Sequence, residues 1–176
     1  MLVLGIDPGT AITGYGLVRG DRPGAPTLVE CGVIRTHARE PLASRLAEIY
    51  DGICQIISEH RPTILSIEDV FYSRNVRTTV VLGHARGVIM LAAQQHGLAI
   101  HEYPPAAIKK AVVGNGAATK EQVQFMLTRL LRLKSVPSPS DASDGVAAAL
   151  TYLLAPRLPT IASLSRPLQP GSQVGR

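Results

Sequence analysis

The first third of the chain alternates short apolar runs with turn residues, a pattern typical of β-strands. Runs rich in aliphatic residues span Leu2 to Asp7, Gly14 to Val18 and Leu28 to Thr36. A Pro-Gly pair closes the first run, and a segment rich in Gly, Pro and Asp (residues 20–26) separates the second from the third. Three successive strands without an intervening helix predict an antiparallel meander.

The hydrophobic period then lengthens to between three and four residues. Apolar side chains recur at this spacing from Leu42 to Ile57, which predicts an amphipathic helix that ends near Pro62. Thr63 to Tyr72 is expected to form a fourth strand that runs into a loop, and Ala99 to Tyr103 a fifth. Thr78 to His96 predicts a helix that is apolar on nearly every side, and such a helix needs cover on more than one side.

Two more helices are predicted in the last third. Thr119 and Gln122 have the spacing of a capping box, and the helix that they open carries an apolar stripe from Val123 to Leu131. A final helix opens at Ser140 or Asp141, after a loop rich in Ser and Pro. Strands followed by alternating helices and strands predict a mixed α/β architecture in layers. We expect one domain over residues 1–155 and a flexible basic tail over residues 156–176.

Composition supports a single globular domain. Apolar residues make up 45% of the 176 residues and charged residues 18%. The first residues lack the charged segment of a signal peptide, and no apolar run approaches 18 residues, so we expect a cytoplasmic protein that does not enter a membrane. Cys31 and Cys54 lack metal-binding spacing and are expected to be reduced thiols.

The charge distribution favours a polyanionic partner. The formal net charge is +5, and the window from Tyr103 to Lys134 holds six basic residues against one acid, Glu121. Nucleic acid is one explanation of this window, and a solvated helix face is the other.

Acidic residues stand at a few informative positions. Asp7 ends the first strand, where open α/β sheets commonly gather ligands. Asp141 and Asp144 share one side of the last helix, although an acidic first turn is also favoured by the helix dipole. Glu68 and Asp69 interrupt an apolar strand, where a carboxylate needs a partner. Alternation puts these two on opposite faces of the strand, and the pattern alone leaves both open.

Carboxylates that converge from two strands and a helix would form an oxygen-rich site. Mg²⁺ and Mn²⁺ prefer such ligands, and a pair of these ions can hydrolyse a phosphodiester. The chain has no apparent Ser-His-Asp set, phosphate-binding P-loop or Cys/His zinc pattern that would indicate another chemistry.

Five blocks of sequence carry a family resemblance. They are LGIDPGT, IEDVFYSRN, LGHARG, AIKKAVVGNGAATKEQVQFM and DASDGVAAALTYL, and they lie in order over roughly residues 1 to 155. In these blocks the chain resembles the RuvC family of bacterial Holliday junction resolvases. The resemblance implies an α/β, RNase H-like fold in which helices flank a five-stranded mixed sheet.

The resemblance also implies roles for individual residues. The catalytic and metal-binding residues it implies are Asp7, Glu68, Asp141 and Asp144, which favours Glu68 over Asp69. It implies DNA contacts by Lys109 and Lys120, with Lys110 as an alternative to Lys109, and by Phe71, Arg74 and Arg77 in a loop near the junction centre. Phe71 could instead belong to the core.

By the same resemblance, the expected activity is paired, symmetric hydrolysis of two junction strands of like polarity, leaving 5′-phosphates, in homologous recombination and DNA repair. It implies a metal-dependent endonuclease with two Mg²⁺ per active site, replaceable by Mn²⁺, that binds four-way junction DNA as a homodimer and works with RuvA–RuvB. We expect the apolar helix from Thr78 to His96 to form the dimer contact. A sugar-kinase-like phosphotransferase would need more than twice this length, and the intact acidic set argues against a silent junction-binding module.

Overall fold

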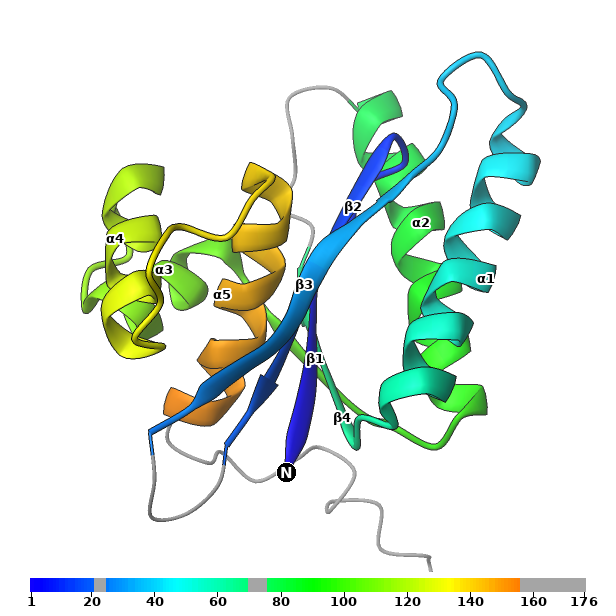
Figure 1. Cartoon of the computed structure of the whole chain (residues 1–176). Coiled ribbons are helices and arrows are strands. Elements are labelled where there is room, and N and C mark those ends of the chain that lie inside the picture. Colours follow the sequence, from blue (N-terminus) through cyan, green and yellow to red (C-terminus); the bar gives the residue numbers. More distant parts are fainter. Residues whose placement is uncertain (21–24, 70–75, 156–176) are drawn as a thin grey trace, which may run out of the picture.

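The computed structural model describes residues 1–20, 25–69 and 76–155, and these form a sheet between two layers of helices (Figure 1). The sheet has five strands in the order β3-β2-β1-β4-β5. Their bounds are Leu2–Asp7 (β1), Ile12–Arg19 (β2), Thr27–Arg35 (β3), Ile64–Glu68 (β4) and Ala99–Tyr103 (β5). The first three strands pair antiparallel, whereas β4 lies parallel to both β1 and β5. The predicted meander and mixed sheet are confirmed.

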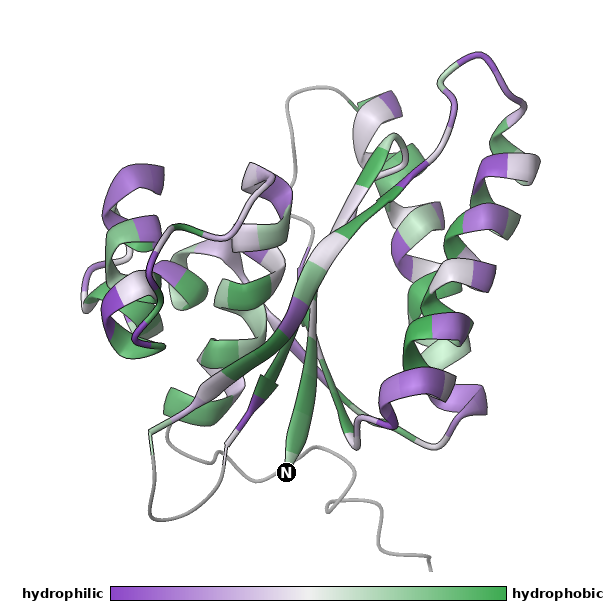
Figure 2. Cartoon of the chain, viewed as in Figure 1, coloured by the Kyte–Doolittle hydropathy of each residue, from purple (hydrophilic) through white to green (hydrophobic). Residues whose placement is uncertain are grey.

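Helices cover both faces of this sheet (Figure 1). One face is covered by α1 (Leu42–His60) and α2 (Val76–Gln95), and the other by α3 (Pro105–Val113), α4 (Lys120–Leu130) and α5 (Ser140–Leu154). Strand β1 is buried on both sides, since Val3 belongs to the core beneath α5 and Leu4 to the core beneath α1 and α2. Figure 2 shows the resulting hydrophobic layers along the sheet and the helix faces turned toward it.

Several predicted helix boundaries are confirmed. The Thr119 side chain accepts a hydrogen bond from the Gln122 backbone, and the Gln122 side chain accepts one from the Thr119 backbone, so the capping box of α4 is complete. Helix α1 ends where Arg61 takes a left-handed conformation (φ 52°) immediately before Pro62. Helix α5 begins at Ser140, as expected.

Helix α3 was missed by the sequence analysis, which predicted no helix between the strand ending at Tyr103 and the helix opened by Thr119. Pro105 occupies the first turn of the helix, where its missing N–H would have had no partner in any case. Gly114 ends the helix with φ 87°, a conformation that glycine adopts without strain. The helix buries only Ile108 and Val112, so its apolar stripe is too short to stand out in the sequence.

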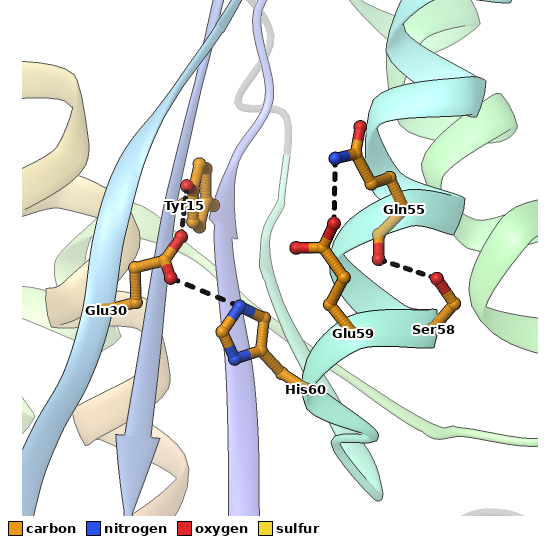
Figure 3. A network of polar contacts seen from close by, with 6 residues as sticks. All are labelled: Tyr15, Glu30, Gln55, Ser58, Glu59 and His60. Carbon is orange, nitrogen blue, oxygen red and sulfur yellow. Dashed lines mark hydrogen bonds and ion pairs between the residues drawn. The ribbon is translucent and has the colours of Figure 1, made fainter.

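A polar network connects the end of α1 to strands β2 and β3 (Figure 3). Tyr15 Oη of β2 donates to Glu30 Oε1 of β3 at 2.7 Å, and His60 Nε2 at the end of α1 lies 3.2 Å from Glu30 Oε2. Burial, followed by this hydrogen bond, raises the pKa of Tyr15 to about 12. The Glu30 carboxylate therefore has a partner for each oxygen.

Helix α2 is covered on one side only within the described part of the chain. Ala85 and Ile89 are fully buried, with the helix lying against α1, whereas Val76, Val80 and Leu91 are 74%, 53% and 51% exposed. By length and composition this helix could also span a membrane, a test that core helices of soluble proteins pass as well. The expectation of cover on a second side is thus not met by this chain's own described residues.

Candidate active site

Acidic and basic side chains meet in a pocket at the carboxyl ends of the central parallel strands. The pocket has a volume of about 260 Å³ and lies where β1 and β4 meet α3, α4 and α5. Its charged lining residues are Asp7, Glu68, Asp144, Lys109 and Lys120, and its apolar ones are Pro105, Ile108, Val123 and Ala147. A second hollow between α3 and α4, of about 330 Å³, is lined mainly by apolar side chains.

Strand register places Asp7 and Glu68 together. Strands β1 and β4 run parallel with Ile6 opposite Ile67, so the next residue along each strand is a carboxylate at the same edge of the sheet. Ser66, two residues before Glu68 and therefore on the same face, donates through Oγ to the Ala148 carbonyl of α5 at 2.6 Å. Glu68 thus faces the side of the sheet that α5 covers.

Helix α5 reaches this edge because glycines let it lie directly on the strands. A Cβ on Gly5 would overlap the α5 backbone at Gly145 and Ala149, and one on Gly14 would overlap the Asp141 carbonyl. In return, a Cβ on Gly145 would lie 2.6 Å from Tyr15 Cα. Contact between backbones leaves no room for side chains, so α5 is held where Asp144 enters the pocket.

The sequence analysis did not assign these glycines a role. The only signal available was their spacing, since Gly14 and Gly16 are two residues apart in β2 and therefore share a face. Glycine in a strand interior indicates close approach of another backbone.

Negative charge is crowded in the pocket. Burial, and then the neighbouring carboxylates of Glu68, Asp144 and Asp141, raise the pKa of Asp7 to about 7. Burial and then Asp144 raise the pKa of Glu68 to about 7 as well, against the opposing charges of Lys109 and Lys120. Burial also raises the pKa of Asp144. Raised pKa values in a cleft are typical of functional sites.

Two lysines border the acidic group. Lys120 Nζ donates to Asp144 Oδ2 at 2.6 Å. Burial lowers the pKa of Lys120, but this bond and the charges of Asp144, Asp141 and Asp7 outweigh it and raise the pKa. Lys109 lines the pocket from α3, whereas Lys110 is exposed and does not line it.

Asp69 lies on the other side of the sheet from Glu68. Its Oδ1 is 3.3 Å from Arg86 Nη2 on α2, the helix that covers the opposite face. The two acids that the sequence pattern left open are thereby distinguished, since only Glu68 lines the pocket.

Of the remaining residues that the sequence analysis singled out, the structure describes only some. Arg77 lies exposed in the first turn of α2, which corrects its expected position in a loop: the helix begins two residues earlier than the apolar pattern indicated. Phe71, Arg74 and the tail of residues 156–176 lie outside the described residues.

The donor set suits a hard divalent cation. Within the described part of the chain, no three His, Cys, Asp or Glu side chains are arranged closely enough to hold a metal ion. The acidic side chains of the pocket nevertheless supply carboxylate oxygens, the ligands that Mg²⁺ and Mn²⁺ prefer. The raised pKa values of Asp7 and Glu68 show that negative charge is costly there, and a bound cation would remove that cost.

Comparison with known proteins bears on this arrangement. The family model described as crossover junction endodeoxyribonuclease RuvC matches residues 3–152. The chain belongs to the RuvC family. Curated RuvC proteins from Pelotomaculum thermopropionicum and Heliobacterium modesticaldum are 47% and 49% identical to it, over 86% and 85% of this chain and 92% of each relative.

A solved RuvC structure gives the same answer for the fold. The structure of T. thermophilus RuvC in complex with Holliday junction substrate is 32% identical, has a TM-score of 0.83, and aligns over 88% of this chain and 93% of that one. The predicted RNase H-like α/β fold is confirmed. The family match ends at residue 152, and the division into a nuclease domain (1–155) and a tail stays a prediction.

Proposed function

We propose that this chain is a metal-dependent endonuclease that cleaves four-way DNA junctions. The observation that carries the proposal is the convergence of family-positioned carboxylates at one edge of the sheet. Asp7, Glu68 and Asp144 come from three elements and line one pocket, and Asp141 is near enough to raise the pKa of Asp7. Membership of the RuvC family and the junction complex of its structural neighbour support the same activity.

Asp7, Glu68, Asp141 and Asp144 are the residues that would hold the metal, which we propose to be two Mg²⁺ ions, replaceable by Mn²⁺. The chemistry supplied by bound Mg²⁺ is activation of water and neutralisation of charge on a phosphodiester. The carboxylates must be ionised to bind a cation, so protons compete with the metal and metal affinity should fall as the pH drops below about 7.

The lysines have two tasks in this proposal. Lys109 presents a positive charge at the mouth of the pocket for a DNA phosphate. Lys120 does the same and also holds Asp144 by its 2.6 Å hydrogen bond, which fixes one oxygen of that carboxylate. The apolar side chains of Ile108 and Val123 line the same pocket beside these charged groups.

Paired incisions favour a homodimer. A four-way junction has approximate twofold symmetry, and two cuts at equivalent positions need two identical active sites, which a twofold dimer supplies. We propose the outer side of α2 as the contact, since Val80 and Leu91 are exposed there. A Cβ on Gly83 or Gly87 would meet nothing within 4 Å, so this side is flat enough for another helix to approach.

The cellular setting belongs to the same proposal. Products with 5′-phosphates and 3′-hydroxyls can be rejoined directly, which suits homologous recombination and DNA repair in the cytoplasm. Cooperation with RuvA–RuvB is proposed from family membership.

The decisive experiment compares substrates. Labelled four-way junction, linear duplex and RNA–DNA hybrid of the same sequence are each incubated with the protein in Mg²⁺ or in EDTA. We expect paired cuts in two strands of like polarity, in the junction only and with Mg²⁺ only. Preferential cutting of the hybrid would assign another nuclease activity, and an uncut junction that is still bound would indicate a binding module.

A further inference from the structure

An arginine on the far side of the sheet connects α2 to the strand that carries Glu68. The Arg86 side chain is only 17% exposed and pairs with two carboxylates, Asp69 and Glu102. Its Nη2 lies 3.3 Å from Asp69 Oδ1 and also contacts Glu102 Oε2. These residues line neither described pocket.

The two carboxylates mark the place where β4 and β5 end. Glu68 is paired with Tyr103 in the parallel register, and Ile67 with Glu102. The Asp69 N–H donates to the Tyr103 carbonyl at 2.8 Å, which extends the strand pairing one residue past Glu68. Arg86 therefore bridges the two strands immediately beside the residue that points into the active site.

Arg86 offsets the repulsion between two carboxylates. Asp69 and Glu102 are about half exposed and carry like charges on adjacent strands, which without a cation would repel one another. Arg86 Nε and Nη2 are shielded from water and lack a hydrogen bond of good geometry, so their compensation comes from the two carboxylate charges. A planar guanidinium can meet two carboxylates at once, which an ammonium group does less well.

We propose that Arg86 is a positioning residue for Glu68. By holding Asp69 and Glu102 together it fixes the end of β4, and so the direction in which Glu68 enters the pocket on the opposite face. Arg86 itself touches neither metal nor DNA in this role. The proposal rests on the proposed function in one respect only, namely that Glu68 is a metal ligand.

The test compares Arg86→Gln with wild type and with Arg45→Gln. Arg45 is a matched control because its Nε also makes a tertiary hydrogen bond, to Thr36 Oγ1 at 3.0 Å, on α1 and away from the pocket. Three quantities are measured for each protein: Mn²⁺ affinity by calorimetry without DNA, the Mg²⁺ concentration that gives half-maximal junction cleavage, and junction affinity in EDTA.

Arg86→Gln should weaken Mn²⁺ binding and raise the half-maximal Mg²⁺ concentration by the same factor, roughly 10-fold, the usual effect of removing an outer-shell support. Junction affinity in EDTA should stay within about twofold, and Arg45→Gln should change none of the three. Arg86→Lys, which keeps the charge but not the fork, should recover part of the loss. A lower melting temperature with unchanged metal affinity would make Arg86 merely structural and overturn the proposal.

A second variant keeps the test decisive if Arg86→Gln does not fold. The double variant Asp69→Asn/Glu102→Gln retains Arg86 but removes both of its charged partners, and it should shift metal affinity in the same direction. Normal metal affinity in the double variant would overturn the proposal. If wild type binds Mn²⁺ but cuts no junction, the proposed function fails while the metal-binding measurements still decide the role of Arg86.

Discussion

The two faces of the sheet are packed in different ways. On the α1 and α2 face, long side chains such as Leu4, Ile6 and Ile53 fill the space between sheet and helices. On the α5 face, Gly5 and Gly145 bring backbone against backbone, and every residue of α5 from position 142 to 151 is buried except Asp144, which is partly buried.

The two kinds of packing differ in how far they can adjust to a change. Contacts between long side chains can adjust when one partner changes, because other rotamers are available. Contacts between backbones cannot adjust in this way, so α5 is held at a defined position over β1 and β2. We call the side of the sheet covered by α5 the rigid face and the side covered by α1 and α2 the adjustable face. The carboxylates proposed to bind metal lie at the rigid face. On the adjustable face, by contrast, both oxygens of the Glu30 carboxylate already have protein partners, Tyr15 and His60.

The largest expected effect is the loss of chemistry at the rigid face. Asp7→Asn, Glu68→Gln, Asp141→Asn and Asp144→Asn should each reduce the cleavage rate at least roughly 100-fold, about 2.7 kcal/mol in activation free energy, because charge at the metal site is lost without loss of volume. Junction binding in EDTA should persist. Asp69→Asn is the matched control and should be much milder, and cleavage near the wild-type rate by any of the four would remove that residue from the site.

The next largest effect concerns packing. Gly5→Ala should lower the free energy of unfolding by about 2 kcal/mol or more, since its Cβ would overlap the backbone of α5. Gly52→Ala on α1 is the comparison from the adjustable face: its Cβ would meet only side-chain atoms of Ile34, at 2.9 Å from Cδ1, 3.2 Å from Cγ1 and 3.3 Å from Cγ2. We expect that variant to stay within about 1 kcal/mol of wild type, because a side chain can shift more readily than a backbone and alanine favours the helix. Equal losses in urea unfolding would erase the contrast between the faces.

Dimer formation should instead depend on α2, the helix that covers the adjustable face. Val80→Glu on the exposed side of α2 should weaken the dimer at least roughly 10-fold, about 1.4 kcal/mol, and reduce paired cutting while the monomer stays folded. Ser58→Glu on the exposed side of α1 should leave the dimer intact, and Ile89→Glu should unfold the protein, because Ile89 is fully buried. Sedimentation decides the matter, and a wild-type protein that is monomeric on junction DNA would contradict the proposal.

In the absence of metal, the free energy of unfolding should depend on pH because Asp7 at the rigid face has a raised pKa. An unfolded Asp releases its proton near pH 4, whereas Asp7 in the folded chain keeps it until about pH 7. Between these values the folded state binds more protons, so its stability falls as pH rises, by on the order of 4 kcal/mol over about three pH units. Urea unfolding in EDTA at pH 5 and pH 8 should show this fall, and Asp7→Asn should reduce it. A wild-type stability that rises over the same range relative to the variant would have the wrong sign.

The smallest effect separates two neighbouring lysines. Lys109→Ala should reduce the salt dependence of junction binding by about one unit of slope, the value for one lost phosphate contact. Lys110→Ala should have less effect, since Lys110 does not line the pocket. The comparison uses binding in EDTA, where cleavage does not interfere, and a larger change from Lys110 would reverse the assignment.

Much of the fold could be predicted from the sequence. Local signals were enough for β1, for the amphipathic stripe of α1 and for the capping box at Thr119, since each depends on residues a few positions apart. Helix α3 was missed because its two buried residues give hardly any period and its opening proline is also a strand terminator.

The choice of candidate site residues depended on contacts between elements that are far apart in the sequence. The pattern of residues identified Asp7, Asp141 and Asp144 as acids at element ends, but alternation in β4 could only put Glu68 and Asp69 on opposite faces, and it was the family resemblance that favoured Glu68. Only the tertiary structure shows which face meets α5, because that depends on strand order and on glycines in β1, β2 and α5 that let backbones touch. The pairing of Arg86 with Asp69 and Glu102 likewise arises from elements separated in sequence and joined only by packing, since charges on different elements interact only after the fold has brought them within a few ångströms.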